Sequence, residues 1–205
     1  MATVAKLKIG PADQGRELTL DEFIDADFEP GWLYDLARGR VDVTEIPGLN
    51  HGMIVLRISE MFGDYNRTHP GLIKYRGGGA ESRLRLPGMV SDRHPDHAVY
   101  LDPPPRRKRG PWTSWIPHIV VEVLSVGGEQ RDLVEKREEY LRIGVHEYWI
   151  LDPKARTFTA LKRAGDVWEE VKVAPGAVYA THFLPGLEVR PDDLFGPVEE
   201  PFDEE

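Results

Sequence analysis

The strongest pattern in the chain is a nearly continuous run of apolar residues from Ile119 to Leu124. Such a run is typical of a central strand that is buried on both faces of a sheet. Residues 129–143 follow with helical spacing of apolar positions, and Gly144 is suited to end that helix. Further strands are predicted where short apolar or alternating runs lie between turn residues, at 72–75, 83–86, 98–101, 147–151, 158–161 and 167–173.

The first half of the chain carries its own signals for helices and turns. A capping-box pattern at residues 19–22 predicts the start of a short helix. Residues 33–44 alternate around the turn Arg38-Gly39, which predicts a β-hairpin. Asn50 is the predicted cap of a longer amphipathic helix that ends near residue 70. This order of elements predicts a mixed α/β (α+β) domain whose sheet is centred on residues 119–124.

The chain divides into one predicted domain and two flanking segments. Its length of 205 residues suits a single compact domain. Residues 1–17 are polar without clear periodicity, so we expect a loose arm there. Residues 18–195 hold all the predicted elements and form the domain. Residues 196–205 combine acids with prolines, which is typical of a disordered tail.

Composition excludes several kinds of chemistry. The chain has no cysteine, so disulfides, thiolate nucleophiles, iron–sulfur clusters and cysteine-bound zinc are ruled out. It lacks an apolar run of about 18 residues, so no membrane span is predicted. The first residues lack the apolar core of a signal peptide, and we expect a cytoplasmic protein.

The net charge of −9 at first argues against nucleic acid as a partner. Seven acids and no base lie in residues 192–205, so the rest of the chain carries only −2. A local basic cluster, Arg106, Arg107, Lys108 and Arg109, stands out in that remainder. Because local patches decide encounters more than totals do, this cluster is the predicted nucleic-acid contact.

Glu122 is the most informative single residue, because it lies inside the apolar run Ile119 to Leu124. An unpaired carboxylate in such surroundings costs several kcal/mol or shifts its pKa upward. A metal ion, a lysine or water at a strand end would compensate it. The alternative is a surface glutamate on an edge strand.

Two further residues on other elements have side chains that could meet Glu122. Asp96 precedes the predicted strand at 98–101, although it could be an ordinary turn residue and Asp92 is a competing acid. At 100° per residue, Lys136 falls on the inward side of the helix over 129–143, and Glu139 falls on the outward side. An inward lysine either extends to the rim or meets a buried acid. We predict that its amine lies within about 4 Å of Glu122 or Asp96.

Asp96, Glu122 and Lys136 together suggest metal-assisted chemistry on phosphate. Two carboxylates are hard oxygen ligands that suit Mg²⁺ or Mn²⁺. Such a cation polarises a phosphate, and a lysine can orient the attacking water or stabilise the developing charge. The spacing permits this arrangement without establishing it.

Longer motifs give the chain a specific resemblance. They are Pro95-Asp96-x-Ala-Val, Ile-Val-Val-Glu122-Val-Leu-Ser125, Asp132-x-x-x-Lys136-x-x-x-Tyr140 and Gly144-Val-x-Glu-Tyr-Trp-x-x-Asp152-Pro153. Over residues 18–195 the sequence resembles the Uma-two family of endonucleases, in the PD-(D/E)XK, restriction-endonuclease-like superfamily. The resemblance implies a mixed central β-sheet flanked by helices, with an additional N-terminal β-hairpin.

The resemblance also assigns roles to residues. It implies that Asp96, Glu122 and the carbonyl of Val123 hold Mg²⁺ or Mn²⁺. Lys136 would be the catalytic lysine, because Leu124 stands where the superfamily often has it. Asp35 takes the place of the family's hairpin glutamate, as a further catalytic acid that is one methylene shorter.

The leading hypothesis is therefore a metal-dependent endonuclease, a hydrolase that cuts phosphodiester bonds of DNA. The first alternative is a catalytically inactive module on the same fold that binds nucleic acid or a protein. The second is an interaction protein of a mobile-element or defence system. A homodimer is expected because cutting two antiparallel strands suits two-fold symmetry.

Overall fold

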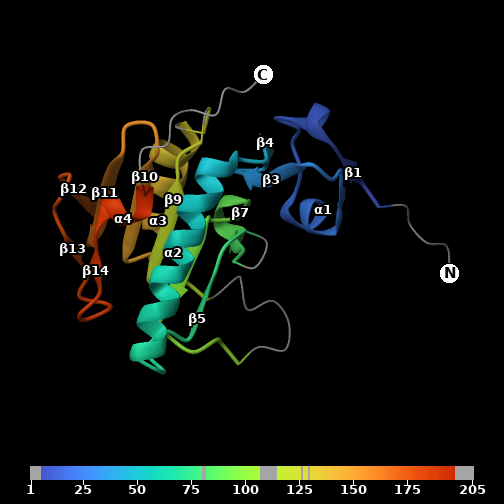
Figure 1. Ribbon diagram of the computed structural model, residues 1–205. Helices are drawn as coiled ribbons and strands as arrows, with labels where there is room; N and C mark the ends of the chain where they lie inside the picture. The colour runs from blue at the N-terminus through green and yellow to red at the C-terminus, as the bar shows by residue number, and fades with distance from the viewer. Residues whose placement is uncertain (1–5, 80–81, 107–114, 126, 129, 197–205) are drawn as a thin grey trace, which may run out of the picture.

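A six-stranded mixed sheet forms the centre of the molecule in the computed structural model (Figure 1). The structure describes residues 6–79, 82–106, 115–125, 127–128 and 130–196. The strands follow one another across the sheet as β12 (Val167–Val173), β11 (Thr157–Ala164), β10 (Glu147–Asp152), β9 (Ile119–Val123), β8 (His97–Tyr100) and β5 (Tyr75–Gly77). Only β9 and β10 are parallel, and every other neighbouring pair is antiparallel.

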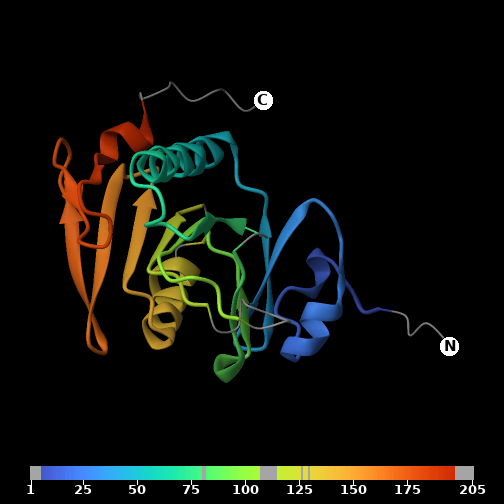
Figure 2. The same cartoon turned by 90° about the horizontal axis from the view of Figure 1, so that it is seen from below.

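Helices cover both faces of this sheet (Figure 2). The long helix α2 (Leu49–Thr68) and the short α4 (Pro191–Phe195) lie over one face. The other face is covered by α3 (Lys136–Ile143), which directly continues a π-helical segment, η5 (Arg131–Glu135). Gly144 ends α3 in the left-handed conformation at a φ of 101°, as the sequence predicts.

A second, four-stranded sheet lies beside the central one. Its strands run in the order β4 (Arg40–Glu45), β3 (Trp32–Ala37), β7 (Ser91–Arg93) and β6 (Leu84–Leu86). The N-terminal elements that precede it are β1 (Lys8–Ile9), the 3₁₀ turn η1 (Pro11–Asp13), α1 (Leu20–Asp25) and β2 (Asp27–Phe28). A further 3₁₀ turn, η3 (Pro87–Met89), and the paired strands β13 (Tyr179–Ala180) and β14 (Glu188–Val189) complete the described elements.

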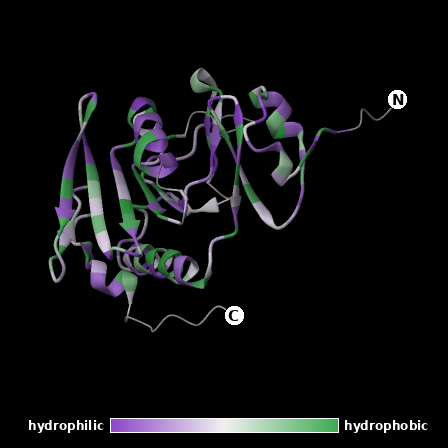
Figure 3. Cartoon of the chain, turned by 90° about the horizontal axis from the view of Figure 1, so that it is seen from above, coloured by the Kyte–Doolittle hydropathy of each residue, from purple (hydrophilic) through white to green (hydrophobic). Residues whose placement is uncertain are grey.

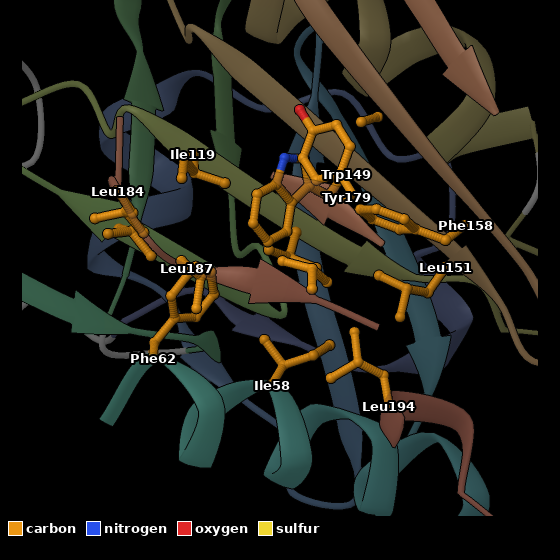
Figure 4. Packing of buried hydrophobic residues seen from close by; sticks show 14 of the residues in the cluster. Ile58, Phe62, Ile119, Trp149, Leu151, Phe158, Tyr179, Leu184, Leu187 and Leu194 are labelled. Carbon is orange, nitrogen blue, oxygen red and sulfur yellow. The ribbon is translucent and has the colours of Figure 1, made fainter. Parts of the chain in front are cut away.

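Alternation along β9 decides which core each of its residues joins. Val121 and Val123 pack into the larger core beneath α2, which also contains Trp149 and Phe158 (Figure 4). Val120 packs into the core beneath α3. Because Glu122 follows Val121 on an alternating strand, its side chain also points toward α3. Helix α2 carries both hydrophobic and hydrophilic residues along its length, as its position at the surface requires (Figure 3).

The predicted fold class is confirmed, and so are several of its local elements. The hairpin forms between β3 and β4, and Thr19 and Glu22 make the reciprocal bonds of a capping box before α1. No helix among the described residues is long and apolar enough to cross a membrane.

Other expectations need correction. Within the predicted loose arm of residues 1–17, Ile9 is buried and β1 pairs with β2, because Phe23 and Tyr34 provide an apolar cluster for it. Helix α2 is capped by Gly48 rather than Asn50. The predicted tail at 196–205 lies outside the described residues, apart from Gly196.

The helix over 129–143 also differs from its expected faces. Glu139 is fully buried, whereas Leu133 is 39% exposed. The cause is η5, because a π-helical turn inserts one extra residue and shifts the faces of the helix around it. Lys136 and Tyr140 keep their predicted inward positions.

Candidate active site

The carboxylate of Glu122 is buried and has specific partners. Its Oε1 accepts hydrogen bonds from Lys136 Nζ at 2.8 Å and from the Tyr140 hydroxyl at 2.7 Å. Burial raises the pKa of Glu122 to about 8, against the opposing effect of the Lys136 charge. Glu122 is therefore not a surface residue of an edge strand, since β9 is flanked by β8 and β10.

Lys136 is held by two acids in the protein interior. Its amine lies 2.8 Å from Glu122 Oε1 and 3.1 Å from Asp132 Oδ1, and the side chain is 4% exposed. Burial alone would lower its pKa, but Asp132 and Glu122 outweigh burial and raise the pKa above its ordinary value. The predicted approach of Lys136 to Glu122 is thus present. Asp132 was missed as a partner, although its i,i+4 spacing from Lys136 signals that contact.

Asp96 lies directly before β8, next to the end of β9. Its Oδ2 accepts a hydrogen bond from the Val123 backbone N–H at 2.7 Å and lies 3.2 Å from His51 Nε2. The backbone N–H of Asp96 points to Glu122 Oε2 at 3.4 Å. Burial lowers the pKa of His51, but the hydrogen bond to Asp96 and the negative charges of Asp96 and Glu122 together outweigh burial and raise the pKa. The two predicted acids therefore meet at one end of the β8–β9 pair.

Asp35, on β3, occupies a different wall of the site. It accepts hydrogen bonds from His94 Nδ1 at 2.8 Å and from the His94 backbone at 3.2 Å. Burial raises its pKa, yet the His94 hydrogen bond and the charges of Lys136 and Arg93 lower the pKa overall. Within the described residues, Asp35 makes no hydrogen bond or ion pair with Asp96, Glu122 or Lys136.

These side chains line one pocket of about 340 Å³. Its charged and polar lining includes all four predicted acidic or basic site residues, together with residues that sequence reasoning did not assign to the site. The set is Asp35, Thr44, His51, Arg83, His94, Asp96, Glu122, Ser125, Arg131, Asp132 and Lys136. The fold thus gathers residues from both sheets and from η5 and α3 around a single cavity.

A buried ion network fixes α3 against the second sheet. Arg93 on β7 is fully buried and pairs with Glu139 at 2.7 Å and with Glu135 at 3.1 Å. The guanidinium also lies 3.7 Å from Asp35. Since Lys136 lies on the same helical stretch as these glutamates, the network determines where its amine points.

Replacing Arg93 by methionine is expected to destabilise the protein by about 3–5 kcal/mol, because the buried Glu139 would keep only the half-exposed Arg38, at 3.5 Å, as a cationic partner. Urea denaturation followed by circular dichroism measures the change. Arg67→Ala is the matched control, because the Arg67–Asp64 pair is more than 70% exposed on both sides and should contribute little. Equal stability of the two variants would contradict the role given to Arg93.

Gly78 packs against the backbone that holds Asp96. A Cβ atom at position 78 would lie 1.8 Å from the carbonyl oxygen of Asp96, so the strand end would have to move. We expect Gly78→Ala to displace Asp96 and, under the metal-dependent activity proposed below, to lower metal affinity and cleavage by at least about tenfold, because displaced side chains lose their geometry. Titration calorimetry with Mn²⁺ measures the first effect. Gly52→Ala on α2 is the control, since a Cβ there meets nothing within 4 Å.

The predicted basic cluster is only partly described. Arg106 is exposed, and Arg107, Lys108 and Arg109 lie outside the described residues. Trp115, which follows that segment, packs against Tyr100 with ring centroids 4.4 Å apart. This tryptophan is therefore part of the buried cluster near β5 and β8.

A mixed sheet with two acids and a lysine at one strand end is the arrangement of a restriction-endonuclease-like nuclease fold. The family model described as "Uma2: Putative restriction endonuclease" matches residues 20–192, and the chain belongs to this family. The crystal structure described as "a putative nuclease belonging to DUF820" from Anabaena variabilis is similar, with a TM-score of 0.71. At 20% identity, that match covers 87% of this chain and 97% of the other. No curated protein matches the sequence.

Proposed function

We propose that the protein is a metal-dependent endonuclease that hydrolyses phosphodiester bonds of DNA. Membership of the Uma2 family supports a nuclease in general. The observation that carries the finer proposal is the approach of Asp96, Glu122 and Lys136, from three separate elements, within one pocket. Nothing in the folding of the sheet alone requires two acids and a lysine to be gathered there.

The donor set fits a hard divalent cation. In the part of the chain that the structure describes, no three His, Asp or Glu side chains form a complete metal cage. Mg²⁺ typically needs no such cage, since it keeps several waters and uses one or two carboxylates. Asp96 and Glu122 would supply those carboxylates. Val123 is the proposed third ligand through its carbonyl, and its backbone N–H already donates a hydrogen bond to Asp96.

When bound, the cation would supply positive charge that polarises the phosphate and makes a nearby water more acidic. Lys136 would donate a hydrogen bond to that water or to the phosphate oxygens on which negative charge develops. Asp132 and Tyr140 hold the amine and Glu122 in place for this role. His51 fixes the rotamer of Asp96, and His94 holds Asp35 at the pocket wall, where we propose that Asp35 orients water.

A cleavage assay on supercoiled plasmid, linear duplex, single-stranded DNA and RNA tests the proposal. We expect cleavage with Mg²⁺ or Mn²⁺ and none with EDTA. A catalytically inactive binding module would bind the same substrates and bind metal without cutting them. No cleavage of any substrate with either metal would overturn the proposed activity.

We also propose that the active form is a homodimer, since two-fold symmetry suits cutting of two antiparallel strands. Sedimentation velocity with and without a short duplex measures the state directly. A monomer in both conditions that still makes double-strand cuts would contradict this part of the proposal.

A further inference from the structure

One wall of the active-site pocket is apolar and aromatic. It is built from the N-terminal region: Phe23, Phe28, Trp32, Leu33, Tyr34 and Pro47 line the same cavity as Asp96 and Glu122. Leu33 is 50% exposed and Phe28 is 37% exposed, so part of this wall is open to a ligand. A site that handled only phosphate and a cation would have no need of such a surface, because phosphate is bound by charges and N–H groups.

The aromatic rings of this wall are held in place. Phe28 packs against Phe23 and against Tyr34, with ring centroids 5.0 Å apart in each pair. The Tyr34 hydroxyl donates a hydrogen bond to the carbonyl of Glu29, and this bond fixes its ring. Leu33 and Asp35 alternate onto the same face of β3, so an exposed apolar side chain lies beside the acidic edge of the site. The wall is thus a preformed surface.

The charges of the lining define what can enter. Four acids (Asp35, Asp96, Glu122, Asp132) and three permanent cations (Arg83, Arg131, Lys136) line the pocket. Without metal the acids and the permanent cations nearly cancel, so the pocket does not attract a phosphate, whereas a divalent cation on the acids makes it positive. A nucleotide can then contact both parts of the pocket. Its phosphate binds the charged residues and the cation, and its base stacks its flat apolar face on the aromatic wall.

On the basis of the proposed function, we infer that this wall receives an unpaired nucleobase next to the phosphate that is cut. Bases within an intact duplex are stacked on their neighbours and cannot reach such a wall. The substrate class is therefore DNA with at least one unpaired base: a single strand, a bulge or a locally opened duplex. Trp32 and Leu33 are the proposed specificity-determining residues, because they belong to the wall and bind none of the reacting groups.

Binding measurements test this inference separately from cleavage. The probes are two labelled duplexes of equal length, one fully paired and one with a single bulged base, in Ca²⁺ so that carboxylates are occupied by a hard cation. Fluorescence anisotropy should show at least about tenfold tighter binding of the bulged duplex, the scale of one stacked base. In EDTA, both affinities should fall together.

The variants Trp32→Leu and Leu33→Ala should lose most of this preference while binding the paired duplex within about twofold of the wild type. Trp32→Phe keeps an aromatic face and should restore it. Leu56→Ala is the control, since Leu56 is similarly exposed at 48% but lies on α2 away from the pocket.

Equal affinity of the wild type for the two duplexes would overturn the inference, and so would absence of DNA binding. An equal loss on both duplexes in Trp32→Leu would also overturn it, because that pattern indicates a protein contact or a folding defect. A clear preference in a protein that cuts nothing would uphold this inference and reject the proposed endonuclease activity, so the two failures are distinguishable.

Discussion

Replacing Lys136 by methionine is expected to lower the cleavage rate by about 10²–10³-fold while metal binding survives. Methionine retains much of the volume of the side chain and removes only its charge and its hydrogen bonds. The lysine amine lies 2.8 Å from Glu122. In the proposed mechanism it acts on the water and the phosphate rather than on the cation. In this variant the cleavage rate should therefore fall while the affinity for the metal stays close to that of the wild type.

The assay must allow for the loss of a buried charge. Glu122 has a pKa of about 8 even beside the lysine, and removal of Lys136 would raise the pKa further. Cleavage and Mn²⁺ titration are therefore compared at about pH 9 and above, where Glu122 is more fully ionised.

Lys136→Arg and Arg142→Met serve as controls for Lys136→Met. The first keeps a charge in the site, and the second removes one from the exposed side of α3. If Lys136→Met cuts DNA at the wild-type rate, the lysine is not catalytic; the protein is still an active nuclease, so the inactive-module alternative is also rejected. If Lys136→Met loses metal binding at high pH, Lys136 instead has the role of positioning the proposed metal ligands Asp96 and Glu122.

The core of the site could be predicted from the sequence because its residues stand out locally. Glu122 interrupts an apolar strand, and Lys136 interrupts the inward face of a helix. Both contrasts carry an energetic cost that only a partner can offset, so each residue indicates that a partner exists. Asp96 gave a weaker local signal, as an acid before a short strand with Asp92 as a competitor, and the family resemblance then favoured Asp96.

Other features could not be predicted because they depend on contacts between distant parts of the chain. Arg93 and Glu139 are 46 residues apart, and nothing in either local pattern signals their buried pair. The π-helical segment η5 shifts the helix faces, so a projection at 100° per residue placed Glu139 outside. The same holds for Ile9, whose burial depends on pairing between β1 and β2.

The aromatic wall was missed for a related reason. Phe28, Trp32 and Leu33 look like ordinary residues of a small N-terminal core, and Trp32 and Tyr34 indeed belong to one. Their second role arises only because the second sheet lies beside the end of β9. Periodicity assigns a residue to a face of its own element, whereas a pocket is formed by faces of different elements.

The second large effect is expected for Glu122→Gln, which should weaken Mn²⁺ binding by at least about tenfold and abolish cleavage. Glutamine keeps the shape of the side chain and can still accept hydrogen bonds from Lys136 and Tyr140, so the fold should survive. Titration calorimetry measures the affinity. Glu138→Gln is the control, because Glu138 lies on the same helix as Lys136 but is 62% exposed and pairs with Arg38.

The pH dependence gives this last prediction a direction that a general loss of structure would not reproduce. With a pKa of about 8, Glu122 is largely protonated at neutral pH in the metal-free protein. A cation must displace that proton, so Mn²⁺ affinity in the wild type should rise with pH up to about 8 and level off above it. Binding near pH 7 should release close to one proton, which calorimetry in buffers of different ionisation enthalpy detects.

In Glu122→Gln both the proton release and the rise with pH should disappear. If the variant keeps the wild-type affinity and the same pH profile, the cation binds elsewhere and the proposed ligand role of Glu122 is wrong.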